Sequence, residues 1–468
     1  MSVAAFLLVL VSMLLLLPAC FNDSGDDDDD DAGPIELDDD TTDDDDTGDD
    51  DTTDDDDTVD DDTSDDDDDD DGPTRSFHVA SAPLQYFEDL DNYFIGESFD
   101  FAGFAGNLDA VSLHMDSFFG VPWAQFADED GDKDFDLPKV WTDAMDQIAA
   151  DAETLGLPVY LSLTPLDGTR AALAPAPVKM DNGYLGKEPY INGCFDFDKD
   201  EKADEIKTAY RNYVNWMIDK FDPTWLTTVI EINIYESACE DEYASMLKFA
   251  NEIYDMVKAT HPDLPTFPTF VVHFLYRGNK PFALCGSYSQ KCLEKELEIH
   301  ADLKRDRMAL SSYPRLDGFR MNDFPDDLYS LIADLTGERL VWAETGWPSG
   351  DTVWDLDASP VAQNCVNGIP SDAAEQEAFM EYLFAEAQAQ GSDLVTWWSY
   401  RDFLPEGFPQ TCPCYHEDPE WCILSDVLQP TGLLPAFLLW GQMGMIEHDL
   451  DPKSAKTAWD AWRAMPIE

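Results

Sequence analysis

The chain has 468 residues and carries 100 Asp and Glu against 27 Lys and Arg, a formal net charge of −73 at pH 7. Residues 21–73 contain 31 Asp, one Glu and no basic residue, which leaves 100 − 32 = 68 acidic residues in the rest of the chain. A surface this acidic argues against nucleic-acid binding, which depends on cationic patches.

The chain begins with an apolar segment over residues 4–17. Its length suits a signal-peptide core and falls short of the roughly 20 apolar residues of a transmembrane helix. It ends in Leu17-Pro18-Ala19-Cys20, which resembles a bacterial lipoprotein box, although residues 1–5 lack the usual Lys or Arg. The resemblance implies a signal peptide over residues 1–19 and a lipid on Cys20. A short membrane anchor with an unmodified Cys20 is the alternative.

Residues 20–73 follow as runs of Asp broken by Thr, Gly and Ser. Such a segment cannot bury enough apolar area to offset the entropy of ordering, and its like charges repel one another. It therefore predicts a disordered, extended spacer with an upper reach of roughly 170–190 Å at ~3.3–3.6 Å per residue. Calcium binding by its carboxylates is the alternative, but a spacer requires no defined geometry.

Residues 74–468 alternate short β-prone runs with amphipathic helical stretches. Eight strands alternating with helices predict a parallel sheet closed into a (β/α)8 TIM barrel, in which chemistry sits at the carboxyl ends of the strands. The expected strands are Phe77–Pro83, Ala110–Met115, Pro158–Thr164, Thr227–Tyr235, Thr269–Leu275, Met308–Tyr313, Leu340–Thr345 and Leu394–Tyr400. The expected helices are Leu137–Leu155, Asp204–Phe221, Asp241–Thr260, Leu293–Asp306, Phe324–Leu335, Ser371–Gln390 and Ser454–Met465.

Eight cysteines follow Cys20, and an even number in an exported chain suggests disulfides. Cys285 and Cys292 would close a short loop, and the other pairings stay open. A zinc site at Cys412, Cys414 and Cys422 is a weaker alternative, because the C-x-C spacing is unlike that of zinc motifs. The eight are Cys194, Cys239, Cys285, Cys292, Cys365, Cys412, Cys414 and Cys422.

The seventh expected strand delivers a carboxylate to the barrel mouth in the stretch LVWAETGWPSG, residues 340–350. This stretch resembles the nucleophile signature of family 17 glycoside hydrolases, the β-1,3-glucanase family, within the wider clan of retaining glycosidases built on (β/α)8 barrels. The resemblance implies that Glu344 is the catalytic nucleophile. A buried structural ion pair is the other interpretation of this residue.

The same resemblance implies a second carboxylate at the end of the fourth strand, usually directly after an Asn. Glu231 matches this acid/base position, and Ile230 occupies the place of the Asn. Asn233 would share the face of Glu231 if the strand continues, and we expect it to supply a substitute sugar contact. Glu236 competes for the acid/base role but would face the opposite way. Retaining glycosidases hold the two carboxyl groups ~5–5.5 Å apart.

Polar and aromatic residues end other strands. The resemblance implies that Tyr313 partners Glu344 and that a Trp after the eighth strand forms the floor of the sugar site. Only one of Trp397 and Trp398 can face inward, and the sequence does not say which. His114 is a further candidate sugar contact, as are Asp116 and His273, and each has packing as its alternative.

The acidic loop over residues 128–136 resembles a calcium loop, but Lys139 stands where the twelfth-position Glu would be. We therefore expect no metal or other cofactor, with calcium as the alternative. The whole sequence predicts a monomeric retaining glycoside hydrolase for β-linked poly- or oligosaccharides. It would be lipid-anchored to a bacterial membrane, facing the periplasm or the cell surface. A non-catalytic carbohydrate-binding lipoprotein on the same barrel is the alternative, and a structural surface protein is a third possibility.

Overall fold

The structure is a computed structural model. It describes residues 73–82, 106–115, 119–127, 135–179, 185–277, 289–315, 319–350, 352–355, 365–402, 441–447 and 450–468, with 352–355 and 365–369 described for the backbone alone. The predicted signal peptide, Cys20, the acidic spacer, most of the loop 128–136, Asp116 and the cysteines at 285 and 412–422 lie outside these ranges. No helix among the described residues is both long and apolar enough to cross a membrane.

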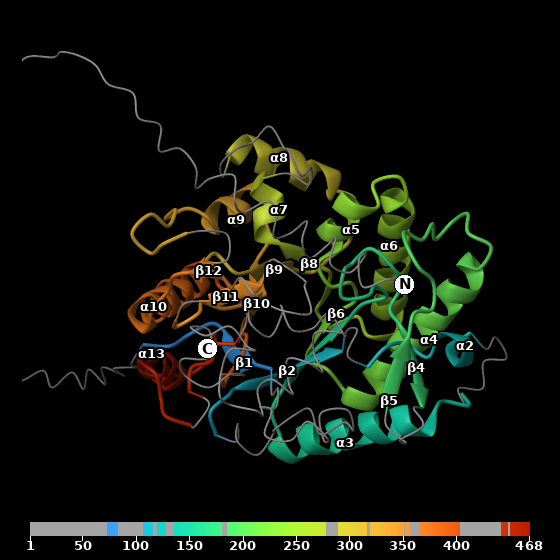
Figure 1. Cartoon of the computed structure of the whole chain (residues 1–468), viewed down its shortest axis with the longest axis horizontal. Helices are drawn as coiled ribbons and strands as arrows, with labels where there is room; N and C mark the ends of the chain where they lie inside the picture. Colours follow the sequence, from blue (N-terminus) through green and yellow to red (C-terminus); the bar gives the residue numbers. More distant parts are fainter. Residues whose placement is uncertain are drawn as a thin grey trace, which may run out of the picture. The chain divides into compact units, whose positions relative to one another are not determined.

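The centre of the fold is a single parallel sheet ringed by helices (Figure 1). Its order is β7-β6-β3-β2-β1-β13-β10-β9-β8, and neighbouring strands within it pair in parallel. The strands are β1 (His78–Ser81), β2 (Ala110–Met115), β3 (Val159–Leu163), β6 (Trp225–Thr227), β7 (Thr266–Phe267), β8 (Thr269–Val271), β9 (Met308–Ser312), β10 (Leu340–Thr345) and β13 (Leu394–Trp397).

The two edges of this sheet are halves of one strand. Only Pro268 separates β7 from β8. Proline has no N–H to donate to a ladder, so it interrupts the strand there. On one side of the break Thr266 pairs with Leu226 of β6, and on the other Thr269 pairs with Ala309 of β9. The two halves together fill the fifth position and close the ring, which confirms the predicted (β/α)8 barrel.

Helices cover the outside of the ring in the predicted alternation (Figure 1). They bury amphipathic faces; α4, for example, buries Ile206, Tyr210, Tyr213 and Met217 at helical spacing. The helices are α2 (Trp123–Phe126), α3 (Lys139–Leu155), α4 (Ala203–Phe221), α5 (Ile232–Ala238), α6 (Tyr243–Thr260), α7 (Val272–Arg277), α8 (Gln290–Ile299), α9 (Ser330–Thr336), α10 (Ala373–Ala389) and α13 (Ser454–Arg463). Two antiparallel hairpins are added, β4 (Ala176–Lys179) with β5 (Leu185–Glu188), and β11 (Thr352–Asp355) with β12 (Cys365–Ile369).

The expected fourth strand, Thr227–Tyr235, begins where β6 ends, and the expected fifth strand, Thr269–Leu275, extends past the end of β8. The helix expected from Ser371 begins two residues later, at Ala373. The fourth strand ends at Thr227 and the fifth at Val271, and each is followed by a short helix, α5 or α7. Short apolar runs with β-branched residues do not distinguish a strand from a buried helical turn. The N-cap of α10 is Asp372, which accepts a hydrogen bond from the Glu375 N–H at 2.9 Å, rather than Ser371. Because Asn233 and Glu236 lie on a helix, the argument from strand alternation fails for both.

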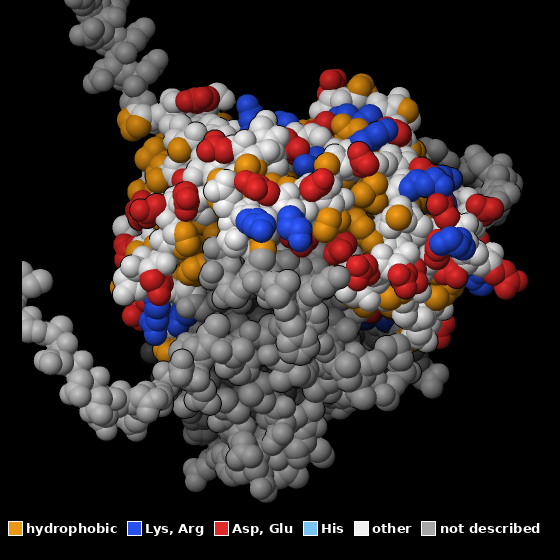
Figure 2. Space-filling view, turned by 90° about the horizontal axis from the view of Figure 1, so that it is seen from above, with side chains coloured by type: hydrophobic (Ala, Val, Ile, Leu, Met, Phe, Trp, Pro, Cys, Tyr) orange, Lys and Arg blue, Asp and Glu red, His pale blue; other side chains and the backbone are white. Residues whose placement is uncertain are grey.

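A small apolar cluster lies inside the barrel, and nearly every strand contributes a residue to it. It consists of Ala80, Ala110, Tyr160, Trp225, Phe267, Ala309, Val341, Ala343 and Leu394. A much larger cluster lies between the strands and the helices. On the surface, acidic side chains outnumber the Lys and Arg side chains scattered among them (Figure 2).

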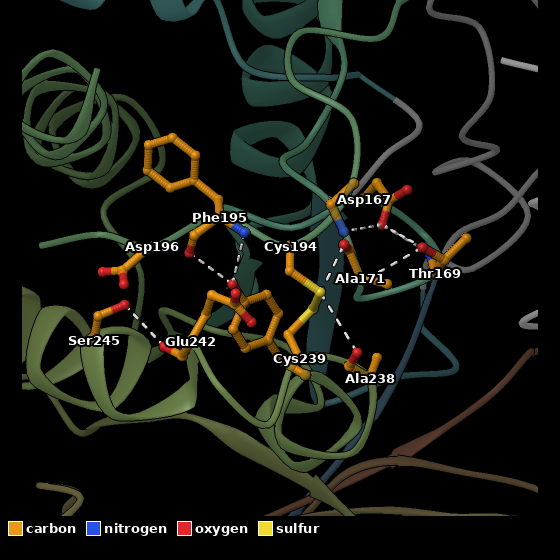
Figure 3. The surroundings of a disulfide bond; sticks show 12 residues. Asp167, Thr169, Ala171, Cys194, Phe195, Asp196, Ala238, Cys239, Glu242 and Ser245 are labelled. Atoms are coloured by element: carbon orange, nitrogen blue, oxygen red, sulfur yellow. Dashed lines mark hydrogen bonds between the residues drawn. A yellow bond between two sulfur atoms is a disulfide. The ribbon is translucent and has the colours of Figure 1, made fainter. Parts of the chain in front are cut away.

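A disulfide joins Cys194, in the segment before α4, to Cys239, which directly follows α5 (Figure 3). Together with Glu242 these cysteines form a compact group of metal-ligand residue types, but a disulfide leaves no thiolate for a metal. Cys292 is also disulfide-bonded, and Cys285, its predicted partner, lies outside the described residues.

Candidate active site

Glu344 lies at the carboxyl end of β10 and is almost fully buried. Regular alternation would point it outward with Trp342, but the pairing of β10 shifts register between these residues. Such an irregularity re-aims the side chains beyond it. The Tyr313 hydroxyl donates to Glu344 Oε1 at 2.6 Å. Burial, then the charge and hydrogen bond of Glu344, and last the charge of Glu231 raise the pKa of Tyr313 well above 10, which keeps the phenol a donor.

Glu231 lies between β6 and α5 in a left-handed backbone conformation, with φ of 53°. Its N–H donates to Thr269 Oγ1 at 2.7 Å. Both side-chain oxygens have donors: Ser311 Oγ reaches Oε1 at 2.8 Å and Arg170 Nε reaches Oε2 at 3.1 Å. Two elements, β9 and the loop after β3, therefore hold this carboxylate, and Thr269 of β8 holds its backbone.

Ser311 connects the two predicted carboxylates. It is the register partner of Glu344 across the β9–β10 ladder, where strands lie ~4.8 Å apart, and its hydroxyl donates to Glu231. The pKa of Tyr313 responds to both negative charges. The structure thus brings Glu344 and Glu231 together at the barrel mouth, and their catalytic roles stay predictions.

The two tryptophans after the eighth strand have different environments. Trp397 is fully buried, donates from Nε1 to the Met443 carbonyl at 2.7 Å, and has its ring 6.1 Å from that of Phe379 on α10. It belongs to the layer between strands and helices. Trp398 packs edge-to-face against His114 of β2 at 5.3 Å. Trp398 and His114 therefore stay the candidate sugar contacts, and Trp397 is a core residue.

The backbone of Trp398 also explains a glycine in the nucleophile motif. The Trp398 N–H donates to the Thr345 carbonyl at 2.7 Å. A Cβ on Gly346 would lie 2.7 Å from the Trp398 carbonyl oxygen and 3.0 Å from Met443 Sδ. Only glycine fits at that distance without displacing the chain. The motif glycine thus allows the segment after Glu344 to pack directly on the segment after β13.

Trp347 and Pro348, the next residues of the motif, are hydrogen-bonded to residues at the start of α10. Trp347 is fully buried and donates from Nε1 to Ser371 Oγ at 3.1 Å. The Ser371 hydroxyl donates to the Pro348 carbonyl at 2.6 Å, and Gln376 Nε2 donates to the Trp347 carbonyl at 2.8 Å. These bonds hold the segment that follows Glu344 against the start of α10.

Asn233, predicted as a sugar contact, is fully buried and bonded to backbone. Its Nδ2 donates to the Val271 carbonyl at 3.0 Å, and its Oδ1 accepts from the Val271 N–H at 2.9 Å. The amide side chain thus imitates a strand partner for β8. Because both ends of the amide are engaged and the residue is closed off from solvent, we correct its predicted role to a structural one.

Glu236, the competitor for the acid/base role, lies on α5 near Tyr243. Burial and then the charge of Glu236 raise the pKa of Tyr243. Tyr243 bonds His300 Nδ1 at 2.5 Å, beside α8 on the outside of the barrel. The contacts of Glu231 with Ser311 and Arg170 therefore favour Glu231 as the partner of Glu344.

Arg170 and Ser311 are site residues that the sequence does not single out. Arg170 lies in the loop after β3, outside any periodic pattern, and Ser311 is one small polar residue within an apolar strand. The candidate calcium loop contributes only Phe135 and Asp136 to the described residues, so that alternative lies outside them.

A buried ion pair between Asp402 and Lys453 contacts the segment after Glu344 through Ser349. Lys453 Nζ lies 2.5 Å from Asp402 Oδ2 and donates to Ser349 Oγ at 2.8 Å. Asp402 also accepts from the Gly444 N–H at 2.8 Å. Burial raises the pKa of Asp402 to about 6, although Lys453 opposes this, and burial lowers the pKa of Lys453.

Comparisons with known proteins give a likeness of fold. No family model matches the sequence, and no curated protein matches it. The exo-β-1,4-mannosidase of an Opitutaceae bacterium aligns with a TM-score of 0.50 at 12% identity, covering 84% of this chain and 60% of that one. The Bifidobacterium longum protein GH5_18 aligns at 0.45 and 12%, covering 83% and 81%. An active-site mutant of a Rhizomucor miehei β-1,3-glucanosyltransferase aligns at 0.39 and 12%, covering 81% and 96%. This chain thus spans 60% of the length of the mannosidase chain, and at 12% identity the likeness to the mannosidase shows the barrel fold alone.

Replacing Tyr313 by Phe removes the hydroxyl that donates to Glu344. A hydrogen bond to a charged group contributes about 1.5–3 kcal/mol, so we expect kcat/KM to fall by about one to two orders of magnitude with the fold retained. Steady-state kinetics and the melting temperature measure the two effects. Tyr329→Phe is a matched control, because it removes another buried hydroxyl, 2.9 Å from Ser312 Oγ. Equal losses in both variants would contradict a specific role for Tyr313.

Replacing Lys453 by Met leaves the Asp402 carboxylate buried without its cation. Because the folded-state pKa of Asp402 already exceeds the ordinary 3.8, the folded protein holds this proton more tightly than the unfolded chain. The contribution of Asp402 to the free energy of unfolding therefore decreases as the pH rises from about 3.8 to about 6. We expect a destabilisation of about 3–5 kcal/mol at pH 8 and a smaller one at pH 5.

Urea unfolding at the two pH values measures this difference. The double variant Asp402→Asn/Lys453→Met should lose the pH dependence of the penalty. An equal penalty for Lys453→Met at both pH values would show that the carboxylate is not its cause.

Proposed function

We propose that this protein is a retaining glycoside hydrolase for β-linked glycans. The observation that carries the proposal is the meeting of Glu344 and Glu231 around Ser311 at the carboxyl ends of β10 and β6. Two carboxyl groups at this end of a barrel are the minimum machinery for glycosidic hydrolysis. A solved barrel of similar fold, the exo-β-1,4-mannosidase, lends support.

The proposed reaction is a double displacement. Glu344 attacks the anomeric carbon while the glycosidic C–O bond breaks, and Glu231 gives its proton to the departing oxygen. The product is a glycosyl ester on Glu344. Glu231 then takes a proton from water, which attacks the same carbon and releases Glu344. The Tyr313 hydroxyl donates to Glu344 Oε1 and orients the nucleophile.

The resemblance of the stretch around Glu344 to the signature of a retaining glycosidase family favours retention over inversion. Inverting enzymes place the two carboxyl groups ~6.5–9.5 Å apart to admit a water molecule, and retaining enzymes ~5–5.5 Å apart. One residue, Ser311, both pairs with Glu344 and donates to Glu231, so the two carboxyl groups share a neighbour. Trp398 beside His114 is the proposed floor of the sugar site.

We further propose that the enzyme is exported and anchored. The lipoprotein box at Cys20 supports lipid attachment, and the Asp-rich residues 20–73 supply a spacer between membrane and barrel. A tethered hydrolase would act on large, immobile polysaccharides and release sugars close to the cell. We propose that it works as a monomer.

Replacing the two carboxylates tests the chemistry. A panel of β-glucans, galactans, mannans and their activated aryl glycosides first identifies a cleaved sugar. We expect Glu344→Ala to abolish turnover, and Glu231→Ala to lose about 10²–10⁴-fold on natural substrates. Azide should then rescue each variant differently: attack on the ester of Glu231→Ala gives a β-glycosyl azide, and direct displacement in Glu344→Ala gives the α-anomer.

Glu236→Ala is the matched control, since it removes the neighbouring carboxyl on α5. Azide rescue of this variant instead of Glu231→Ala would reassign the acid/base. Full activity of Glu344→Ala would overturn the assignment of Glu344 as the nucleophile. Binding without turnover across the panel would favour the non-catalytic carbohydrate-binding alternative.

Labelling with palmitate tests the anchor. We expect label on the parent protein and none on Cys20→Ser, with the variant released from the membrane fraction. Hydrolytic activity should be equal in both, because Cys20 lies outside the barrel. An unlabelled parent would leave the protein secreted or held by its apolar segment.

A further inference from the structure

Glu231 depends on an arginine that comes from a different part of the barrel. We propose that Arg170 is the positioning residue of the acid/base, and that the turn around Asp167 and the Cys194–Cys239 disulfide hold Arg170 for this task. The inference rests on the proposed function, since it assigns a role to Glu231.

The Arg170 side chain is buried and directed by two bonds. Its Nε donates to Glu231 Oε2 at 3.1 Å, and its Nη1 donates to the Asp167 carbonyl at 3.1 Å. Its backbone is in the left-handed region, with φ of 57°, and its N–H also donates to the Asp167 carbonyl at 3.0 Å. A non-glycine residue in this region is strained unless its surroundings hold it there.

Asp167 supplies those surroundings by organising the turn that carries Arg170 (Figure 3). Its Oδ1 accepts from the Thr169 N–H at 3.1 Å, the Thr169 hydroxyl at 2.7 Å and the Ala172 N–H at 3.3 Å. Leu166 and Leu173 form a β-bridge that closes the base of the turn. These bonds hold the turn in one conformation and so fix the direction in which the Arg170 side chain points.

The disulfide joins the segment before α4 to the end of α5, which carries Glu231, and lies against the turn. Glu231 and Cys239 are the N-cap and C-cap residues of α5. The Cys239 sulfur lies 3.7 Å from the Ala171 carbonyl oxygen, next to Arg170, and the Cys194 sulfur lies 3.5 Å from the Ala238 carbonyl oxygen (Figure 3). The disulfide thus contacts the turn that carries Arg170 and is bonded to the helix that begins after Glu231.

Glu231 requires such support because its own backbone supplies little. The strand before it is three residues long, and Glu231 itself adopts φ of 53°. A proton donor must keep its acidic oxygen on the leaving oxygen throughout the reaction, and misplacement by 1 Å can cost about 10²-fold in rate. Arg170 at Oε2 and Ser311 at Oε1 define the plane of the carboxyl group.

The test compares Arg170→Gln, Arg170→Lys and the parent on two aryl β-glycosides of the sugar identified in the panel. One carries 2,4-dinitrophenol, which departs without a proton, and the other carries 4-methylphenol, which requires one. For Arg170→Gln we expect kcat/KM to fall about 10²-fold on the 4-methylphenyl glycoside and much less on the dinitrophenyl glycoside. Arg170→Lys should recover part of the loss, and it keeps the test open if Arg170→Gln does not fold.

Arg305→Gln is the matched control, because Arg305 makes another arginine–carboxylate pair that is partly buried, with Glu338 at 2.7 Å, just before β9 begins. It should lower the melting temperature and leave the ratio of the two kcat/KM values unchanged. The double variant Cys194→Ser/Cys239→Ser should shift the ratio in the direction of Arg170→Gln, by a smaller factor. An unchanged ratio of the two kcat/KM values in this double variant would show that the disulfide does not help to hold Arg170.

Equal losses of Arg170→Gln on both glycosides would make Arg170 a merely structural residue and overturn the inference. Glu231→Gln separates this failure from that of the proposed function. If Glu231→Gln shows the leaving-group dependence and Arg170→Gln does not, only the assignment of Arg170 is wrong. If Glu231→Gln shows none, Glu231 is not the acid/base and both proposals fail.

Discussion

The register of β9 against β10 is the constraint on which the candidate site depends. It sets Ser311 opposite Glu344, and the Ser311 hydroxyl in turn bonds Glu231, which arrives from a strand on the far side of β8. A shift of one residue would turn Ser311 away from the barrel interior and leave Glu231 Oε1 without this donor. The meeting of the two carboxylates is therefore a property of strand pairing, and the surrounding loops refine it.

Backbone irregularities concentrate around the two carboxylates. Glu231 and Arg170 both adopt positive φ, and β10 shifts register just before Glu344. Gly346 allows a backbone approach that a methyl group would block. Each of these features costs stability and persists only where neighbouring contacts over-determine it. The disulfide, the Asp167 turn, the bonds of Trp347 and the Asp402–Lys453 pair supply such contacts.

The sequence predicts the barrel and its seventh strand well, because eight apolar runs alternate with helical periodicity and a lone carboxylate ends one of them. It misjudges the fourth strand because Val229, Ile230, Ile232 and Ile234 read as a β-run, whereas tertiary packing turns the chain into α5. Arg170 lies 61 positions before Glu231 in a loop without periodicity. Only the folded backbone reveals such a pair, since no local pattern encodes a contact between loops.

The departure at Ile230 and the presence of Arg170 have a common physical explanation. β6 has three residues and the fifth strand is broken at Pro268, so the ladder between them is short just below the site. Asn233 restores pairing there through its two bonds to Val271. An amide used in this way cannot also contact a sugar or steady a carboxylate, because each of its ends is already bonded and buried. Orientation of Glu231 then falls to side chains from other elements, and among the described residues Arg170 and Ser311 reach it.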